Sequence, residues 1–196
     1  MSTGSDAVDV LKGGGLVVLP TDTVYGLCAA PGDAAAVARI NELKGRTKQP
    51  IALVAASAPA LLECMPELAP RWQELIETLL PGPYTFVLAN PERRLPWLSP
   101  GREGTIGVRV PELPELSRRV LERFGVVAAS SANHHGQPDP RTVDQIPEEI
   151  RAAAGAVLDA GELPGTPSTV IDFSGAVPVV LRVGAGDPQR ALAALG

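Results

Sequence analysis

The sequence is poor in aromatic residues, cysteine and histidine. Aromatic side chains are only 4% of its 196 residues, so the core must be built mainly from aliphatic side chains, which favours helices packed closely against a sheet. The two cysteines, Cys28 and Cys64, are widely spaced, and with only two histidines the chain lacks the usual ligand pattern of a zinc site. We therefore interpret the cysteines as two buried thiols in a reducing compartment.

An excess of positive charge and long apolar runs are also absent. The formal net charge is −5, which excludes the global basic field that attracts proteins non-specifically to nucleic acid, so tight tRNA binding is not expected. No stretch approaches the ~20 apolar residues of a transmembrane helix. Residues 1–10 carry acids and lack the apolar run of a signal peptide. These absences predict a cytoplasmic protein with no membrane partner.

The remaining composition is typical of an ordinary globular α/β protein. Hydrophobic residues make up 45% of the chain and charged residues 20%, and no linker, repeat or low-complexity tract divides it, so residues 1–196 are expected to form one domain. Apolar spacing predicts helices over residues 6–12, 34–43, 59–65, 70–80, 112–124 and 188–195. Apolar or β-branched runs predict strands over residues 16–19, 51–55, 84–89, 105–110, 126–129, 157–158, 168–173 and 177–183. Their irregular alternation favours a twisted mixed sheet with flanking helices.

Polar loops with isolated cations lie next to several of these strands. They combine hydroxyl, amide and cationic side chains, a combination that suits a site for a polyanion. The segments are Thr21–Gly26, Lys44–Arg46, Arg109, Ser131–Asn133, Ser168–Thr169 and Arg182. Each also has a plain structural interpretation, as a solvated helix end, an ion pair on a strand or a capped turn.

Other kinds of site have little support in the sequence. It contains no Gly-x-Ser-x-Gly nucleophile elbow, no Gly-x-x-x-x-Gly-Lys-Ser/Thr phosphate loop and no Gly-x-Gly-x-x-Gly dinucleotide motif. His134 and His135 are adjacent on a polar loop and are expected to be exposed. Asp22 and Asp139 are weak candidates for magnesium ligands, because neither lies in a recognisable metal motif. Any nucleotide site must therefore be of another design.

A series of short segments makes the chain resemble the YrdC family of threonylcarbamoyl-AMP synthases. The segments span nearly the whole chain, and although each is weak alone, the full set in this order is specific. They are Pro20–Leu27, Lys44–Arg46, Pro81–Thr85, Val108–Pro111, Ser131–Asn133, Ser168–Val170 and Leu181–Arg182. The resemblance implies a twisted mixed sheet with flanking helices and a concave basic surface.

The resemblance also implies roles for individual residues. L-Threonine would be held by Thr23, Tyr25, Arg109 and Ser168. ATP would be contacted by Arg46, Gln49, Ser131, Asn133, Asp139 and Arg182. Lys44 and Arg46 would be the catalytic cations that face the phosphates. No metal ligand from the protein is implied, and Mg²⁺ would arrive together with ATP.

Several positions depart from the family pattern. Thr47 stands where a proline usually follows the Lys-x-Arg segment, and a threonine-contacting histidine of the long form aligns with Val54. His134 and His135 replace a common Leu-Ser pair, and a serine that contacts ATP aligns with Asp139. A carboxylate repels a triphosphate unless a metal ion lies between them, so Asp139 is the least expected of the proposed ATP contacts.

The activity implied is the synthesis of threonylcarbamoyl-AMP from L-threonine, bicarbonate and ATP. The product would pass to a tRNA threonylcarbamoyl transferase, with weak or no direct binding of tRNA by this chain. One alternative is an RNA-binding or ribosome-maturation factor, for which the acidic balance and few aromatic residues offer little. A second alternative is a relative that forms a carbamoyl-adenylate without threonine.

Overall fold

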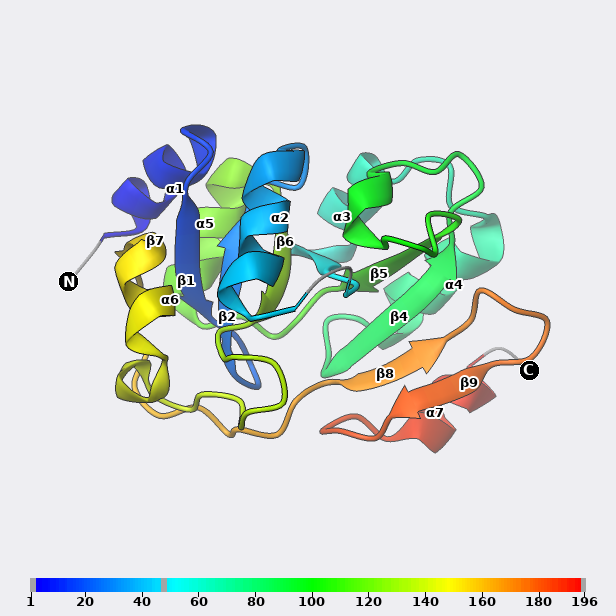
Figure 1. The fold of residues 1–196 in the computed structure, drawn as a ribbon. Coiled ribbons are helices and arrows are strands. Elements are labelled where there is room, and N and C mark those ends of the chain that lie inside the picture. The colour runs from blue at the N-terminus through cyan, green and yellow to red at the C-terminus, as the bar shows by residue number, and fades with distance from the viewer. Residues whose placement is uncertain (1–2, 47–48, 195–196) are drawn as a thin grey trace.

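The computed structural model describes residues 3–46 and 49–194, which form one twisted sheet flanked by helices (Figure 1). The strand order is β7-β1-β2-β6-β3-β5-β4-β8-β9. The strands are β1 Leu16–Pro20, β2 Tyr25–Ala29, β3 Ala52–Ala55, β4 Tyr84–Ala89, β5 Thr105–Arg109, β6 Val126–Ser131, β7 Ala154–Val157, β8 Thr169–Asp172 and β9 Val179–Arg182. The α-helices are α1 Gly4–Lys12, α2 Ala34–Leu43, α3 Ala58–Cys64, α4 Pro70–Leu79, α5 Glu115–Phe124, α6 Glu148–Ala153 and α7 Pro188–Ala193. Two 3-10 turns are η1 Pro96–Leu98 and η2 Val143–Gln145.

Both kinds of strand pairing occur in this sheet. Strand β1 pairs with β7, β3 with β5 and β4 with β8 in parallel. Strand β2 pairs antiparallel with both β1 and β6, and antiparallel pairs also join β3 to β6, β4 to β5 and β8 to β9. The predicted twisted mixed sheet with flanking helices is therefore confirmed.

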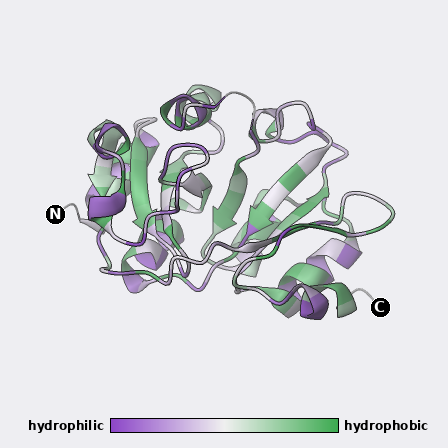
Figure 2. Ribbon diagram, turned by 60° about the horizontal axis from the view of Figure 1, so that its bottom comes forward, coloured by the Kyte–Doolittle hydropathy of each residue, from purple (hydrophilic) through white to green (hydrophobic). Residues whose placement is uncertain are grey.

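One face of the sheet is covered along most of its width. Helices α2, α3, α4, α6 and α7 pack there against alternate strand residues, among them Leu27, Leu53 and Phe86, all fully buried. Successive side chains of a strand point to opposite faces, so every second residue of these strands is apolar and inward. Figure 2 shows this concentration of hydrophobic residues on the strands. Asp33 caps the start of helix α2, because its carboxylate accepts a hydrogen bond from the Ala36 amide at 3.0 Å.

The opposite face is covered over only part of its width. Helices α1 and α5 pack on it through Val8, Leu11 and Val120 against strands β7, β1, β2 and β6. This second apolar cluster ends at β3, where Val54 is its outermost strand residue. Beyond it, on β5, β4 and β8, residues such as Gly107 line a cleft instead of packing under a helix. The fold thus leaves one region of a twisted sheet open.

Most predicted elements are confirmed within a few residues of their predicted ends, but two were missed. Strand β2 begins inside the segment Thr21–Gly26, which was interpreted as a polar loop, and no helix was predicted where α6 lies. Helix α5 begins at Glu115, three residues later than predicted, because Pro114 occupies its cap position. Ser130 and Ser131 follow the strand predicted over residues 126–129 and extend β6 by pairing with β2.

The environment of the two cysteines corrects one prediction. Cys28 is buried, and its burial raises the pKa of the thiol to about 12. Cys64 is only half-buried, since it lies at the end of α3, so the interpretation of both thiols as buried is wrong for this residue. Across the described ranges, no helix combines the length and the apolar character needed to cross a membrane.

Candidate active site

A cleft of about 320 Å³ lies on the partly covered face of the sheet. Small residues on four neighbouring strands form its floor, namely Gly26 on β2, Ala129 on β6, Ala52 on β3 and Gly107 on β5. Because these side chains are short, they leave open space above the sheet, and the loops at the strand ends form the walls of this space. The charged side chains that line the cleft are Arg46, Arg102, Arg109, Arg182 and Asp139. Four cations and one carboxylate suit an anionic ligand.

Arg109, at the end of β5, is held by the loop between β1 and β2. Its Nη2 donates to a carboxylate oxygen of Asp22 and, at 2.7 Å, to Thr23 Oγ1. Asp22 also accepts from the Glu112 amide at 3.2 Å. Only 9% of Arg109 is exposed, and its buried Nε has no hydrogen-bond partner within the described residues. A buried donor without a partner is costly, and a ligand oxygen that reached this atom would relieve that cost.

Burial opposes both charges of the Arg109–Asp22 pair. It raises the pKa of Asp22, although the neighbouring Arg109 cation acts in the other direction. It also lowers the pKa of Arg109, an effect that the nearby charge of Arg182 increases and that Asp22 opposes. An anion bound between Arg109 and Arg182 would relieve their repulsion.

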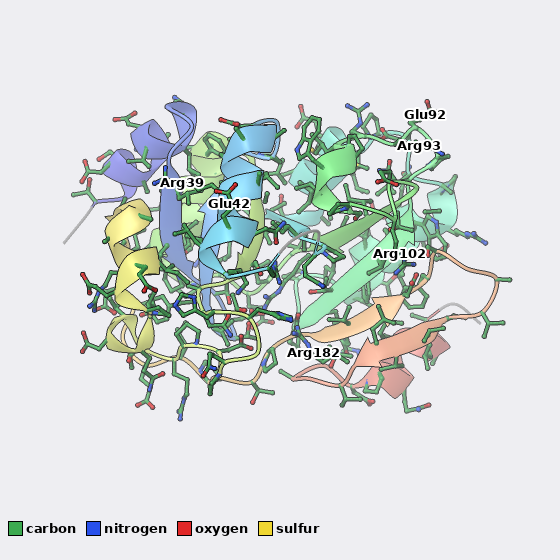
Figure 3. The ribbon with its side chains drawn as sticks, viewed as in Figure 1. Arg39, Glu42, Glu92, Arg93, Arg102 and Arg182 are labelled. Atoms are coloured by element: carbon green, nitrogen blue, oxygen red, sulfur yellow. The ribbon has the colours of Figure 1, made fainter. Side chains whose placement is uncertain are left out.

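Ser168 and Arg182 form the wall of the cleft beside Arg109. Ser168 directly precedes β8 and is buried, with its Oγ 2.8 Å from Thr85 Oγ1 on β4. Arg182 ends β9 and lies near the start of β8 (Figure 3). Its Nε donates to the Ser168 carbonyl at 3.0 Å and its Nη2 to Ser168 Oγ at 3.2 Å. These two hydrogen bonds to Ser168 therefore fix the orientation of the Arg182 guanidinium, although Arg182 is an exposed residue.

Arg46 reaches the cleft from the segment that follows α2. Its Nε donates to Asn41 Oδ1 at 2.7 Å and its Nη2 to Ser130 Oγ at 3.0 Å. Burial lowers the pKa of Arg46 to about 10, so the group stays charged at neutral pH. The preceding Gly45 has φ 65°, a left-handed conformation that favours glycine. The chain turns there, and the side chains of Lys44 and Arg46 take different directions.

Lys44 is not among the residues that line the cleft. It is 2% exposed, and its Nζ donates to the Ser131 carbonyl at 2.5 Å and to Asn133 O and Oδ1 at 2.7 and 2.9 Å. These bonds use the three donors of the ammonium group. Burial and the charge of Arg46 lower the pKa of Lys44 to about 8, whereas Asp139 opposes the shift. Lys44 thus holds the Ser131–Asn133 segment, which differs from the predicted direction toward the phosphates.

The segment that Lys44 holds is ordered by its own side chains as well. Ser131 lines the cleft and donates through Oγ to Asn133 Oδ1 at 2.6 Å. Asn133 is buried outside the cleft lining and donates through Nδ2 to the Gln137 carbonyl at 2.6 Å. The His134 ring contacts Glu149 at 2.8 Å and remains 40% exposed, and the His135 amide donates to the Lys44 carbonyl. The two histidines connect this loop to α2 and α6.

Thr23 and Tyr25, predicted to contact threonine, lie behind the cleft surface. Thr23 is fully buried, and its hydroxyl contacts Arg109 and, at 3.1 Å, Thr21. Tyr25 is also fully buried, and its hydroxyl lies 2.9 Å from Asp159 Oδ1 and 2.7 Å from the Gly161 carbonyl. Burial raises the pKa of Tyr25 to about 12. The structure therefore places Tyr25 against the loop after β7 and not at the cleft.

The remaining predicted ATP contacts differ in position. Asp139 lines the cleft, whereas Gln49 is exposed and lies outside its lining. Thr47, one of the departures from the family pattern, lies outside the described residues. Asp22 is engaged by Arg109, so of the two aspartates considered for magnesium only Asp139 lines the cleft. Within residues 3–46 and 49–194, no three His, Cys, Asp or Glu side chains gather where they could hold a metal ion.

Sequence reasoning missed several polar residues of the cleft. Thr85 and Ser130 both line it, and each contacts a residue that was predicted. Thr85 alternates with the inward Tyr84 and Phe86 along β4, and this alternation was the signal that could have identified it. Arg102 precedes β5 and also lines the cleft, but nothing in its local sequence distinguishes it from other exposed arginines.

Comparison with known proteins connects this geometry to a family. The Sua5/YciO/YrdC family model, described as "Telomere recombination", matches residues 9–184. A putative threonylcarbamoyl-AMP synthase of Mycobacterium leprae is 36% identical over 197 residues, which cover 98% of this chain and 87% of the relative.

Two solved structures share the fold over nearly the whole chain. The structure of Pyrococcus abyssi Sua5 complexed with L-threonine has a TM-score of 0.82 and 33% identity. The match covers 97% of this chain and 56% of that protein, so this chain spans little more than half of it. Escherichia coli YciO has a TM-score of 0.80 and 27% identity, with 94% and 90% of the two chains covered.

Proposed function

The chain belongs to the Sua5/YciO/YrdC family, and from this premise we propose that it is a threonylcarbamoyl-AMP synthase. It joins L-threonine, bicarbonate and ATP into threonylcarbamoyl-AMP and releases pyrophosphate. Relatives at 30–37% identity over most of the chain carry this name. The family relation supports a nucleotidyl-transferring enzyme, and the roles of individual residues are proposed here from their contacts.

The observation that carries the proposal is the grouping of Arg46, Arg109 and Arg182 in one cleft. The buried Nε of Arg109 has no partner in the described part of the chain, and this donor suits one oxygen of the threonine carboxylate. Arg46 and Arg182 are directed by neutral oxygens, so their charges remain available for phosphate groups. The cleft can therefore hold an amino acid and a nucleotide side by side.

The reaction requires no nucleophile from the protein. The threonine ammonium group loses a proton to solvent, and bicarbonate takes up a proton and loses water to give carbon dioxide. The resulting amine attacks the carbon dioxide and releases its second proton, which gives a carbamate. A carbamate oxygen attacks the α-phosphorus of ATP, the bond from that phosphorus to the bridging oxygen breaks, and pyrophosphate leaves. Arg109 fixes the carboxylate, and Arg46 and Arg182 stabilise the charge that develops on phosphate oxygens, so rate acceleration comes from positioning and electrostatics.

Ser131 and Ser168 complete this arrangement as neutral hydrogen-bonding groups at the cleft wall. Lys44 acts on the nucleotide through Ser131, because its ammonium fixes the backbone of that segment. Magnesium would enter with ATP and neutralise part of the triphosphate charge. Asp139 is the carboxylate of the cleft lining that fits such an ion, and a metal ion at this position would remove its repulsion from the phosphates.

The product is a mixed anhydride that hydrolyses in water, which favours rapid transfer to a second enzyme. We therefore include in the proposal a hand-off to a tRNA threonylcarbamoyl transferase, with weak or no direct contact between this chain and tRNA. A location in the cytoplasm, beside ATP and tRNA, belongs to the same proposal. The net charge of −5 is consistent with weak tRNA contact.

The deciding experiment is incorporation of labelled bicarbonate into an adenylate. The purified chain is incubated with ATP, Mg²⁺ and labelled bicarbonate, in parallel with threonine, serine or no amino acid. We expect a labelled adenylate and stoichiometric pyrophosphate with threonine, and much less of both with serine. Equal label without an amino acid would instead identify a carbamoyl-adenylate-forming enzyme, and the absence of label in every reaction would overturn the proposal.

A further inference from the structure

A second charged pair lies at the end of the cleft away from Arg109. Arg102, in the turn before β5, donates through Nη2 to Asp172 Oδ2 at 2.7 Å. Strand β4 lies between β5 and β8, so this bond crosses the face of β4. Val87 of β4 lines the cleft and pairs with Asp172 on one side and with Gly107 on the other. The Arg102–Asp172 pair therefore stands at the level of Val87.

Both members of this pair are held in place by their surroundings. The Arg102 amide donates to the Ser99 carbonyl at 2.9 Å, and its carbonyl accepts from Thr105 N and Oγ1 at 2.8 and 2.9 Å. Asp172 Oδ1 accepts from the Ser174 amide at 2.9 Å and from its hydroxyl at 2.5 Å. The turn thus presents the guanidinium of Arg102, which lines the cleft, beside the carboxylate of Asp172, which lies just outside the cleft lining with 12% of its side chain exposed.

The layout of the cleft separates this pair from the phosphate-binding end. Ser168, which contacts Arg182, directly precedes β8, and Asp172 ends that strand four residues later, which is about 13 Å along extended chain. Figure 3 shows Arg182 and Arg102 toward opposite ends of this strand. Between them the cleft lining is uncharged and includes Val87 and Val170. A nucleotide with its phosphates at Arg182 would lay its planar base on this apolar section, with the edge of the base toward Arg102.

We propose that Arg102 and Asp172 recognise the edge of the adenine base of ATP. Arg102 donates to a ring nitrogen, and Asp172 accepts a hydrogen bond from the 6-amino group. Adenine presents an acceptor beside a donor on its N7 edge, whereas a 6-oxo purine presents two acceptors there, so the carboxylate repels the oxo group. The assignment rests on the proposed function, because it takes ATP as the nucleotide.

Binding of adenosine and inosine monophosphates tests this assignment without turnover. The two nucleotides differ at the 6-position of the base, and titration calorimetry on the full chain measures both affinities. We expect the parent chain to bind adenosine monophosphate about tenfold more tightly than inosine monophosphate. Only the adenosine nucleotide can donate a hydrogen bond to the Asp172 carboxylate, and loss of one such bond corresponds to about this factor. Arg102→Ala and Asp172→Asn should each weaken binding of the adenosine form by about 3- to 10-fold, because Arg102 is nearly half exposed. Asp172→Asn should also reduce the preference for it, because an amide can donate to the 6-oxo group.

A matched control separates base recognition from a general loss of a surface ion pair. Arg94 and Glu67 form a pair of the same length, 2.7 Å, with side-chain exposures of 46% and 14%, compared with 47% and 12% for Arg102 and Asp172. Neither Arg94 nor Glu67 lines the cleft. Arg94→Ala should leave both nucleotide affinities at their parent values.

Three results would overturn the assignment: equal affinities for the two nucleotides in the parent chain, unchanged affinities in both the Arg102 and the Asp172 variants, or an equal loss in Arg94→Ala. If Asp172→Asn disturbs the turn at Ser174, the nucleotide affinities of Arg102→Ala still test the assignment, because that variant leaves the Asp172–Ser174 hydrogen bonds in place. Pyrophosphate release by the parent chain from ATP, threonine and bicarbonate is measured alongside. Its absence would contradict the proposed function, whereas release together with variants of unchanged nucleotide preference would contradict the base assignment alone.

Discussion

The pair formed by Arg109 and Asp22 is predicted to have two separable roles, one in stability and one in binding threonine. The exposed fractions of the two side chains are 10% and 12%, so removal of either charge leaves the other desolvated and unpaired. Such a loss typically costs about 3–5 kcal/mol of the free energy of unfolding. Arg109→Met and Asp22→Asn should each show a loss of this size. The double variant removes both charges and should regain most of the lost stability.

Threonine binding is expected to follow a different pattern across the same variants. Arg109 supplies the buried Nε that is free for a ligand oxygen, and a charge-assisted hydrogen bond contributes about 1.5–3 kcal/mol. Its removal should raise the threonine concentration for half-maximal activity by about 10- to 150-fold. Methionine cannot replace this bond. The double variant should therefore be stable and still require as much threonine as Arg109→Met.

Two measurements distinguish these roles. Urea unfolding gives the free energy of unfolding of the parent, both single variants and the double variant, and pyrophosphate release at saturating ATP gives the threonine requirement. If the double variant recovered both stability and threonine requirement, Arg109 would have no direct contact with threonine. If it were as unstable as Arg109→Met, the reasoning from an unpaired buried charge would be refuted.

Three further predictions concern single residues. Arg46→Ala should lower the rate of pyrophosphate release at saturating substrates by about 10²-fold or more while the chain stays folded by circular dichroism, and a parent-like rate would remove Arg46 from the phosphate site. Lys44 has its pKa lowered from 10.5 to about 8, so between these pH values the unfolded chain holds a proton that the folded chain has lost. The free energy of unfolding should therefore rise with pH across that window relative to Lys44→Met, and equal pH slopes in urea unfolding would contradict the shift. Tyr25→Phe should lose about 1–3 kcal/mol of stability with unchanged threonine and ATP requirements, whereas a raised threonine requirement would place Tyr25 in the substrate site after all.

The local sequence pattern was sufficient to predict most helices and strands, because most of them have a capping, proline or glycine residue that marks where they begin or end. Asp33 caps the start of α2, Pro70 begins α4, and Gly82 lies in the turn before β4, so these ends were predictable from sequence. Strand β2 gave no such signal. It follows a polar motif directly and contains Gly26, and its extended conformation depends on pairing with β1 and β6, the latter about 100 residues away.

The site was predictable to the extent that its residues belong to recognisable motifs. Arg46, Arg109 and Arg182 were chosen from sequence, and the structure brings them to one cleft, although their roles stay predictions. The direction in which the Lys44 side chain points was not predictable, because two of its acceptors are main-chain carbonyls, whose positions no side-chain pattern reveals. The contact of Arg102 with a residue 70 positions away was equally invisible before the chain was folded.

The partners of the cleft arginines also indicate where a triphosphate can lie. Arg109 and Arg102 each donate to a carboxylate, so the charge of each guanidinium is largely balanced locally. Each therefore supplies oriented hydrogen-bond donors to a ligand more than it supplies net positive charge. In the part of the chain that the structure describes, the acceptors that hold Arg46 and Arg182 are neutral hydroxyl, amide and carbonyl oxygens. Their positive charges are therefore not cancelled locally, and a polyanion is attracted most strongly to the region that they share. A carboxylate or a base edge needs only oriented donors, which is what the two paired arginines provide.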